Sequence, residues 1–297
     1  MVVRRYRFVQ VDVFTRRPFG GNQLAVFPEA EGLSDAEMQQ IAAEMNYSES
    51  TFVFPPDDPT ADARVRIFTP GMELPFAGHP VVGTGYVLGL ERGARALTFQ
   101  LGVGPLKVSS DPGDGRVGSA RMEQPLPSFR PAEADRSTLA EIVGLAPEDV
   151  FEASPPEIGS AGVPFLYLPV RSLDAIGRVR PNPDAMSRFF GDDDHPAVYI
   201  FTTETESPEA SAHARMFSLL LGKDVREDPA TGGASGPFGA YLVRHGLRPP
   251  GRLLLEQGYE MGRPSQIEVE IALRDGKISQ VAVGGGVVMM AEGELLV

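Results

Sequence analysis

The sequence predicts an α+β protein made of two similar halves. Short runs in which apolar and polar residues alternate, as in half-buried strands, recur along the 297 residues, with a few stretches of helical spacing between them. The order strand, turn, helix also occurs twice: "RVRIF" leads to "GHPVVGTGYVLGL", and "HARMF" leads to "DPATGGASGPFGAYLV". Because proline and glycine recur near both helix starts, we interpret the repeat as an internal duplication.

The glycine-rich and proline-rich stretch "DPGDGRVG", beginning at residue 111, is the best candidate for the linker between the halves. We therefore expect an N-terminal domain of residues 1–115, joined by a C-terminal strand at about 285–297, and a C-terminal domain of residues 116–284.

Elements of the first half follow from local patterns. Ser34 and Glu37 form a capping box that opens a helix, and Asn46 is its expected stop. A second helix is expected from His79, with Pro80 in its first turn, where the missing N–H costs nothing. The predicted strands are "RFVQVDVF", "NQLAVF", "ESTFVF", "ARVRIFT" and the pair in "ALTFQLGVGPLKVSS".

The second half repeats this order in coarse form. Its predicted helices are "STLAEIVGL", "PDAMSRFF" and "DPATGGASGPFGAYLVRHG". Its predicted strands are "SARMEQP", "FLYLPV", "AVYIFTT", "AHARMFS", "RLLLEQG", "QIEVEIAL" and "KISQVAV".

Composition excludes several classes of function. The chain has no cysteine, which rules out disulfides, thiolate metal sites and thiol nucleophiles. Its net charge of −13 argues against a nucleic-acid partner. No apolar run approaches the roughly 18–20 residues that span a bilayer, and the N-terminal residues lack the apolar core of a signal peptide. We expect a cytoplasmic protein with no membrane partner.

The two repeated helix starts give the first indication of a site. His79 and Asp228 each precede a proline in matching positions of the two halves. We expect the N-termini of both helices to point into a cleft between the domains. Glycines there let a ligand approach the backbone closely, and helix-start N–H groups favour an anion such as a carboxylate.

Five successive blocks resemble the signature blocks of the phenazine-biosynthesis PhzF family: "VDVFTRRPFGGNQLAVF", "LSDAEMQQIAAEMNYSESTFV", "RIFTPGMELPFAGHPVVGTG", "REDPATGGA" and "QGYEMGRPSQIEV". The resemblance implies the diaminopimelate-epimerase fold, with two pseudo-symmetric domains, each an open β-barrel-like sheet wrapped around a central helix. It also implies a homodimer and an isomerase that moves a proton within a small cyclic amino acid without a cofactor.

The family's catalytic positions correspond to Glu49, His79 and Asp228. A carboxylate such as Glu49, partly desolvated by "STFVF", suits proton transfer from carbon. His79 would orient the substrate as a hydrogen-bond donor or act as an assisting acid. Asp228 would bind a substrate amine or assist proton transfer, and it also suits the role of a helix N-cap.

The expected substrate-binding residues are Asn22, Gly78, Thr231, Gly232, Gly233 and Ser235. The family pattern usually reads Asp-Pro-x-Thr-Gly-Ser at the second helix, whereas this chain has Gly233 in the last position. Thr231, Ser235 or backbone N–H groups would then replace the missing hydroxyl. The alternatives are a small-molecule-binding homologue that has lost the chemistry, and a lyase or dehydratase acting on a small amino acid.

The remaining motifs have plainer interpretations. His195 lies in the acidic loop "GDDDHP", where adjacent acids seldom converge on a metal, and we expect no metal site. His213 and His245 lack partner motifs. "VGGGVV" and "PFGGNQ" lack the context of nucleotide-binding loops and are predicted to be tight turns. The turn Met261–Ser265 is expected near the cleft.

Overall fold

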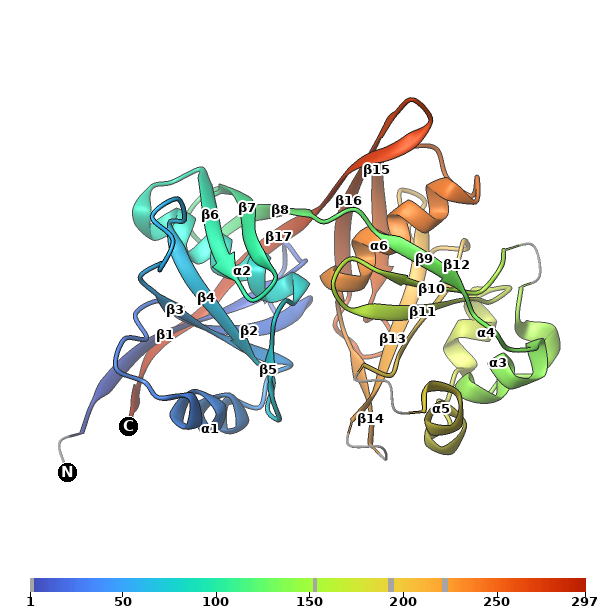
Figure 1. Ribbon diagram of the computed structural model, residues 1–297, viewed down its shortest axis with the longest axis horizontal. Helices are drawn as coiled ribbons and strands as arrows, with labels where there is room; N and C mark the ends of the chain where they lie inside the picture. Colours follow the sequence, from blue (N-terminus) through green and yellow to red (C-terminus); the bar gives the residue numbers. More distant parts are fainter. Residues whose placement is uncertain (1–2, 152–153, 192–194, 221–223) are drawn as a thin grey trace. The chain divides into compact units, whose positions relative to one another are not determined.

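The computed structural model describes residues 3–151, 154–191, 195–220 and 224–297. The chain divides into two compact units, residues 1–124 with 282–297 (unit 1) and residues 125–281 (unit 2) (Figure 1). The stretch expected as a linker is instead the turn of a β-hairpin inside unit 1, between β7 (Gly104–Asp111) and β8 (Val117–Gln124). Glycine and proline favour hairpin turns and linkers alike, so local composition does not separate the two.

Unit 1 is a closed barrel of eight strands. Its other members are β1 (Arg5–Val13), β2 (Asn22–Phe27), β3 (Glu49–Phe54), β4 (Ala63–Phe68), β6 (Ala96–Leu101) and β17 (Lys277–Leu296). Successive pairs run β1–β2, β2–β3, β3–β4, β4–β6, β6–β7 and β7–β8, and the pairs β8–β17 and β17–β1 complete the ring. The short strand β5 (Glu73–Leu74) pairs with β4.

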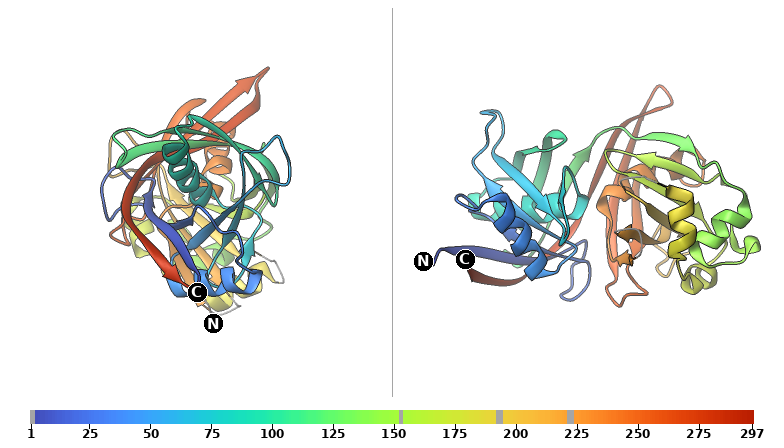
Figure 2. Two further views of the ribbon diagram at one scale, coloured as in Figure 1. Left: turned by 90° about the vertical axis from the view of Figure 1, so that its left-hand side faces the viewer. Right: turned by 60° about the horizontal axis from the view of Figure 1, so that its bottom comes forward.

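Helix α2 (Gly78–Arg92) packs against strands around the barrel wall and lies among them in Figure 2. Because it is enclosed, its residues from Gly78 to Gly89 are all buried. Close packing explains its glycines: a Cβ on Gly85 would lie 2.3 Å from Cγ1 of Val108. The helix begins one residue before the prediction and carries Pro80 in its first turn, as expected.

Helix α1 (Asp35–Met45) begins and ends as its sequence predicts. Ser34 is the N-cap, and the reciprocal bonds of its capping box with Glu37 are present. Asn46 is the C-cap in the left-handed conformation. Met38, Ile41 and Ala42 are buried in a core cluster with aromatic residues of β2, β3 and β4.

Unit 2 repeats the pairing order of unit 1. Its strands are β9 (Ser128–Pro131), β10 (Glu157–Ser160), β11 (Pro164–Pro169), β12 (Ala197–Thr202), β13 (Ala212–Leu220), β14 (Asp224–Asp228), β15 (Gly251–Gln257) and β16 (Ser265–Arg274). Antiparallel β10–β11, parallel β11–β12, antiparallel β12–β13, parallel β13–β15 and antiparallel β15–β16 match β1–β2, β2–β3, β3–β4, β4–β6 and β6–β7 in turn. The predicted duplication is therefore confirmed in the topology.

The helices of unit 2 are α3 (Arg136–Val143), a 3-10 turn η1 (Pro147–Asp149), α4 (Leu173–Arg178), α5 (Pro183–Phe190) and α6 (Gly232–Arg244). Helix α6 is the counterpart of α2 and packs against β10, β11 and β16. Helices α3, α4 and α5 share a separate apolar cluster with the other face of the strands. No helix among the described residues of either unit is long and apolar enough to cross a membrane.

Two local predictions are wrong. Helix α6 begins at Gly232, not at Asp228, because Asp228 ends strand β14 and the residue before a proline disfavours helical geometry. "VGGGVV" is not a turn but lies within β17. Its glycines allow neighbouring segments to approach the strand closely. A Cβ on Gly286 would lie 2.4 Å from the carbonyl oxygen of Thr15.

Candidate functional site

In unit 1, three elements bring Asn22, Glu49 and His79 together at one end of the central helix. Asn22 is the first residue of β2, Glu49 is the first residue of β3, and His79 is the second residue of α2. His79 Nε2 lies 3.3 Å from Glu49 Oε2, and His79 Nδ1 lies 3.1 Å from Asn22 Nδ2. The sequence predicts all three residues for the site, and the fold places them in contact.

Burial determines the charge state of His79. The residue is 3% exposed, and desolvation lowers the pKa of its imidazole to about 3. His79 is therefore neutral at neutral pH, with one donor and one acceptor nitrogen. A backbone hydrogen bond with Gln23 partly offsets this lowering of the pKa, and Nε2 faces the Glu49 carboxylate.

The start of α2 is suited to an anion. The N-cap Ala77 has no side chain that could accept a hydrogen bond from the first turn. The N–H groups of Gly78 and His79 belong to that first turn, where the helix dipole favours negative charge. A negatively charged ligand atom would supply the acceptor that Ala77 lacks.

In unit 2, the start of α6 is organised around a hydrogen-bonded turn from Asp228 to Thr231. Thr231 occupies the N-cap position, and its Oγ1 donates to Oδ2 of Asp228 over 2.6 Å. Ser235 Oγ donates to the carbonyl oxygen of Thr231 over 2.8 Å. Both hydroxyl hydrogens thus have acceptors within the unit. The predicted N-cap role of Asp228 is wrong, because α6 begins at Gly232, three residues after Pro229.

The sequence did not indicate Gln257, the last residue of β15, which joins this turn. Its side chain is fully buried and makes three hydrogen bonds to the turn. A lone glutamine carries no motif. The available signal was its position next to glycine at the end of an apolar strand, within a block that resembles the family.

Two histidines without partner motifs in the sequence have carboxylate partners in the structure. His245 Nε2 lies 3.0 Å from Oε2 of Glu157. His213 Nδ1 lies 3.2 Å from Glu256 Oε2, and its Nε2 lies 3.1 Å from Glu260 Oε1. Burial lowers the pKa of His213, but the hydrogen bonds to both glutamates outweigh it and raise that pKa to about 9.

The acidic run at residues 192–194, considered above as a metal site, lies outside the described residues. Within the described part of the chain, no group of three or more His, Cys, Asp or Glu side chains is arranged to hold a metal ion.

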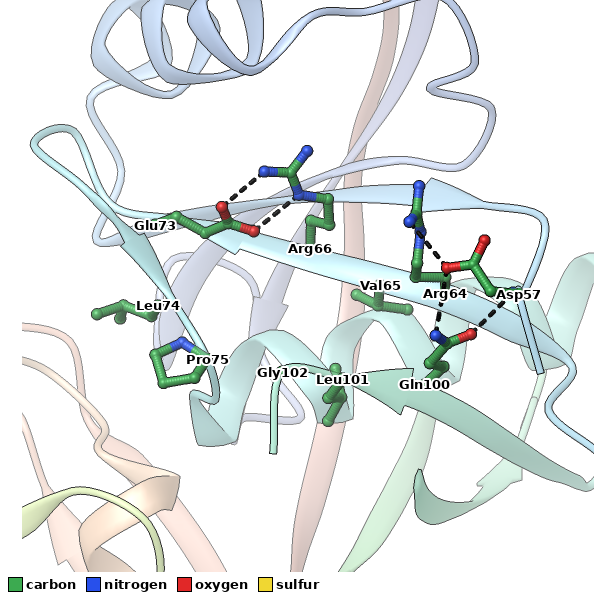
Figure 3. A pocket seen from close by; sticks show the side chains of 10 residues that line it. All are labelled: Asp57, Arg64, Val65, Arg66, Glu73, Leu74, Pro75, Gln100, Leu101 and Gly102. Atoms are coloured by element: carbon green, nitrogen blue, oxygen red, sulfur yellow. Dashed lines mark hydrogen bonds and ion pairs between the residues drawn. The ribbon is translucent and has the colours of Figure 1, made fainter. Parts of the chain in front are cut away.

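A cavity of about 460 Å³ in unit 1 is lined by residues of β4, β5, β6 and the adjoining loops, and none of the predicted site residues lines it. Its charged side chains pair with one another (Figure 3): Arg66 donates to Glu73 over 2.7 and 2.6 Å, and Arg64 donates to Asp57 over 2.9 Å. This pairing satisfies the charges locally. The contact between Glu49 and His79, and not this cavity, is the stronger candidate for chemistry.

Comparisons with known proteins agree with the resemblance in the sequence. A family model described as "Phenazine biosynthesis-like protein" matches residues 11–293. An uncharacterized isomerase of Mesorhizobium japonicum is 37% identical over 98% of both chains. The trans-2,3-dihydro-3-hydroxyanthranilate isomerase of Pseudomonas aeruginosa is 37% identical, over 97% of this chain and 98% of the relative.

Solved structures confirm the predicted fold class. A phenazine biosynthesis protein of the PhzF family from Bacillus anthracis matches with a TM-score of 0.87 and 30% identity, over 99% of this chain and 100% of the other. A hydroxyproline epimerase from Agrobacterium vitis shares the fold, with a TM-score of 0.63 at 14% identity over 99% and 91% of the two chains. The chain therefore belongs to the phenazine biosynthesis-like (PhzC-PhzF) family and is an isomerase of the PhzF type.

Proposed function

We propose that this protein isomerises a small carboxylate-bearing metabolite, such as a cyclic amino acid, by moving one proton without a cofactor. The observation that carries the proposal is the contact of 3.3 Å between Glu49 Oε2 and the buried Nε2 of His79 at the uncapped start of α2. A carboxylate held beside a neutral imidazole, next to N–H groups that favour an anion, suits proton abstraction from a carbon near a carboxylate.

In the proposed step, the Glu49 carboxylate takes a proton from one carbon of the substrate. The electron pair of the broken C–H bond shifts into the conjugated system of the substrate, and the protonated Glu49 returns the proton to a second carbon. The product has the same atoms and charge as the substrate, so no oxidant, reductant or second substrate is needed.

His79 is assigned an orienting role in this proposal. With a pKa of about 3, its imidazole is uncharged at neutral pH and keeps a single ring N–H. The expected role as an assisting acid is therefore disfavoured, and donation from a neutral ring nitrogen is favoured. Asn22 supports that role because it fixes the ring from the opposite side, at 3.1 Å from Nδ1.

Asp228 is proposed to bind the amino group of the substrate, and the start of α6 its carboxylate. The hydrogen bond from Thr231 supports this assignment, since it fixes the carboxylate group of Asp228 without neutralising its charge. That the starts of α2 and α6 serve one substrate stays a prediction from the sequence.

The test is exchange of substrate hydrogen with solvent deuterium, with trans-2,3-dihydro-3-hydroxyanthranilate as the first substrate, because a relative of 37% identity is named for it. Glu49→Gln should lower the exchange rate by about 10²-fold or more, the usual contribution of a general base. Glu44→Gln, on the exposed face of α1, is the matched control. Equal exchange rates in the wild type and Glu49→Gln would refute the role of Glu49 as the general base.

The same experiment separates a lyase or dehydratase from an isomerase. Loss of water or ammonia changes the mass of the product, whereas isomerisation does not. A product of lower mass would replace the proposed reaction class with elimination.

A second candidate is a carboxylate-binding protein that retains the site but not the turnover. Gly233 favours it, because the hydroxyl usual in the family is absent and those of Thr231 and Ser235 are engaged internally. Saturable binding of the substrate without exchange would support this candidate. Exchange that rises in Gly233→Ser would instead show that the chemistry persists and that only the hydroxyl is missing.

A further inference from the structure

Both polar atoms of the Gln257 side-chain amide form hydrogen bonds with the turn that precedes α6. Its Nε2 donates to the carbonyl oxygen of Asp228 over 2.7 Å and to Thr231 Oγ1 over 2.9 Å. Its Oε1 accepts from the backbone N–H of Thr231 over 3.1 Å. The side chain is fully buried, so water cannot replace these partners.

The hydroxyl of Thr231 links Gln257 to the carboxylate of Asp228. Since that hydroxyl accepts from Gln257 Nε2, its single hydrogen is directed to Asp228 Oδ2, 2.6 Å away. The order of donation is therefore fixed: the amide sets the orientation of the hydroxyl, and the hydroxyl sets that of the carboxylate.

The next residue, Gly258, holds the same turn through its backbone. Its φ of +79° is in the left-handed region, and a Cβ there would lie 2.5 Å from the carbonyl oxygen of Pro229. The backbone of the segment after β15 thus lies directly against the segment before α6. Two consecutive residues contact the Asp228–Thr231 turn, one through its side chain and one through its main chain.

We propose that Gln257 is the positioning residue that orients Asp228 and Thr231 at the start of α6. This inference rests on the proposed function, in which Asp228 binds the amino group of the substrate. In this proposal Gln257 does not contact the substrate. It determines the position of Asp228, which does.

A cluster of the buried residues His213 and Glu256 with Glu260 holds Gln257 in turn. Glu256 directly precedes Gln257, is fully buried, and accepts from the backbone N–H groups of residues 206 and 207 over 2.9 and 2.7 Å. His213 contacts Glu256 through one ring nitrogen and Glu260, in the turn after β15, through the other. The chain before Gln257 and the chain after it therefore both contact the imidazole of His213.

The test compares Gln257→Met with Gln266→Met, a control on the exposed face of the neighbouring strand β16. Hydrogen exchange of the Thr231 amide reads the turn directly and needs no substrate. We expect exchange about tenfold or more faster in Gln257→Met, because the buried N–H loses its acceptor. Exchange in the middle of α6, at Phe238–Tyr241, should change little in either variant.

Kinetics provide the second measurement. Gln257→Met should raise KM for the isomerised substrate by about tenfold and change kcat less, as expected for a lost binding contact. Gln257→Glu keeps an acceptor for the Thr231 N–H but loses both donors, so it should restore slow exchange of that amide without restoring KM.

Unchanged exchange at Thr231, or uniformly faster exchange throughout α6, would overturn the positioning role. If wild-type protein turns over no substrate, the proposed function fails, but the amide measurement still decides the role of Gln257.

Discussion

The clearest quantitative prediction concerns the charge on His213 and the pH dependence of stability. Its pKa of about 9 in the fold compares with the ordinary value of 6.5 in an unfolded chain. The folded state therefore holds a proton that the unfolded state has released between these two values. The stabilisation is fully present below pH 6.5 and is lost as the pH rises through 9, at about 1.4 kcal/mol per pH unit within that window.

The difference between these pKa values corresponds to about 3 kcal/mol. His213→Gln removes the titrating group. The deficit, the amount by which the variant's free energy of unfolding falls below that of the wild type, should be largest at pH 6. The deficit should then shrink by about that amount as the pH approaches 9.5. Glu256 keeps its backbone donors in the variant, which favours a folded protein for comparison.

Urea unfolding followed by circular dichroism at pH 6, 7.5, 9 and 9.5 measures this difference. Amide hydrogen exchange in both units assigns it, because the unit 2 amides should report it and those of unit 1 should not. A deficit that stays constant, or grows, between pH 6 and 9.5 would refute the charged state of His213.

Two further predictions concern unit 1 and its packing. His79 behaves oppositely to His213: its pKa of about 3 lies below the unfolded value, so unit 1 should lose stability as the pH falls from 6.5 toward 3, and His79→Gln should flatten that slope in urea titrations. A titration of the imidazole carbon proton of His79 between pH 6 and 7 would contradict this. Gly85→Ala should destabilise the protein by about 1–3 kcal/mol, since the new methyl overlaps Val108, although alanine favours helix. Gly177→Ala, helical but with open space around it, should be neutral or slightly stabilising when both variants are compared by thermal unfolding. Equal losses in both would contradict the packing argument.

Much of the fold was predictable because it rests on local signals. The capping box of Ser34 and Glu37 fixes the start of α1, and Asn46 adopts the left-handed conformation that ends it. The matching of α2 with α6 was visible as a repeat of strand, turn and helix. Such signals act within a few residues along the chain, and tertiary contacts reinforce them.

Elements that depend on distant partners were missed. Strand β14, "DVRED", has too few apolar residues to show alternation, and it forms because β13 supplies its hydrogen-bond partners. The six residues of α4 are too few for a helical period. The glycines in β17 resemble a turn in the sequence, and only the approach of other segments explains them.

The candidate site divides in the same way. Glu49, His79 and Asp228 were identified from the family resemblance, and the duplication linked the last two. Gln257 was not, because its partners lie 26 and 29 residues away in the sequence and meet it only in the folded unit. A buried amide that serves another segment leaves no periodic or spacing pattern.

The closure of the unit 1 barrel has a consequence for synthesis. Strand β1 pairs with the end of β17, so that Arg5 lies opposite Leu296, whereas unit 2 is built from the continuous residues 125–281. A growing chain can thus complete unit 2 while the first seven strands of the barrel still lack their eighth. Until the ribosome has added β17, the edges of β1 and β8 are open to pairing with other chains. The unit that carries Glu49 and His79 is begun before unit 2 and completed after it.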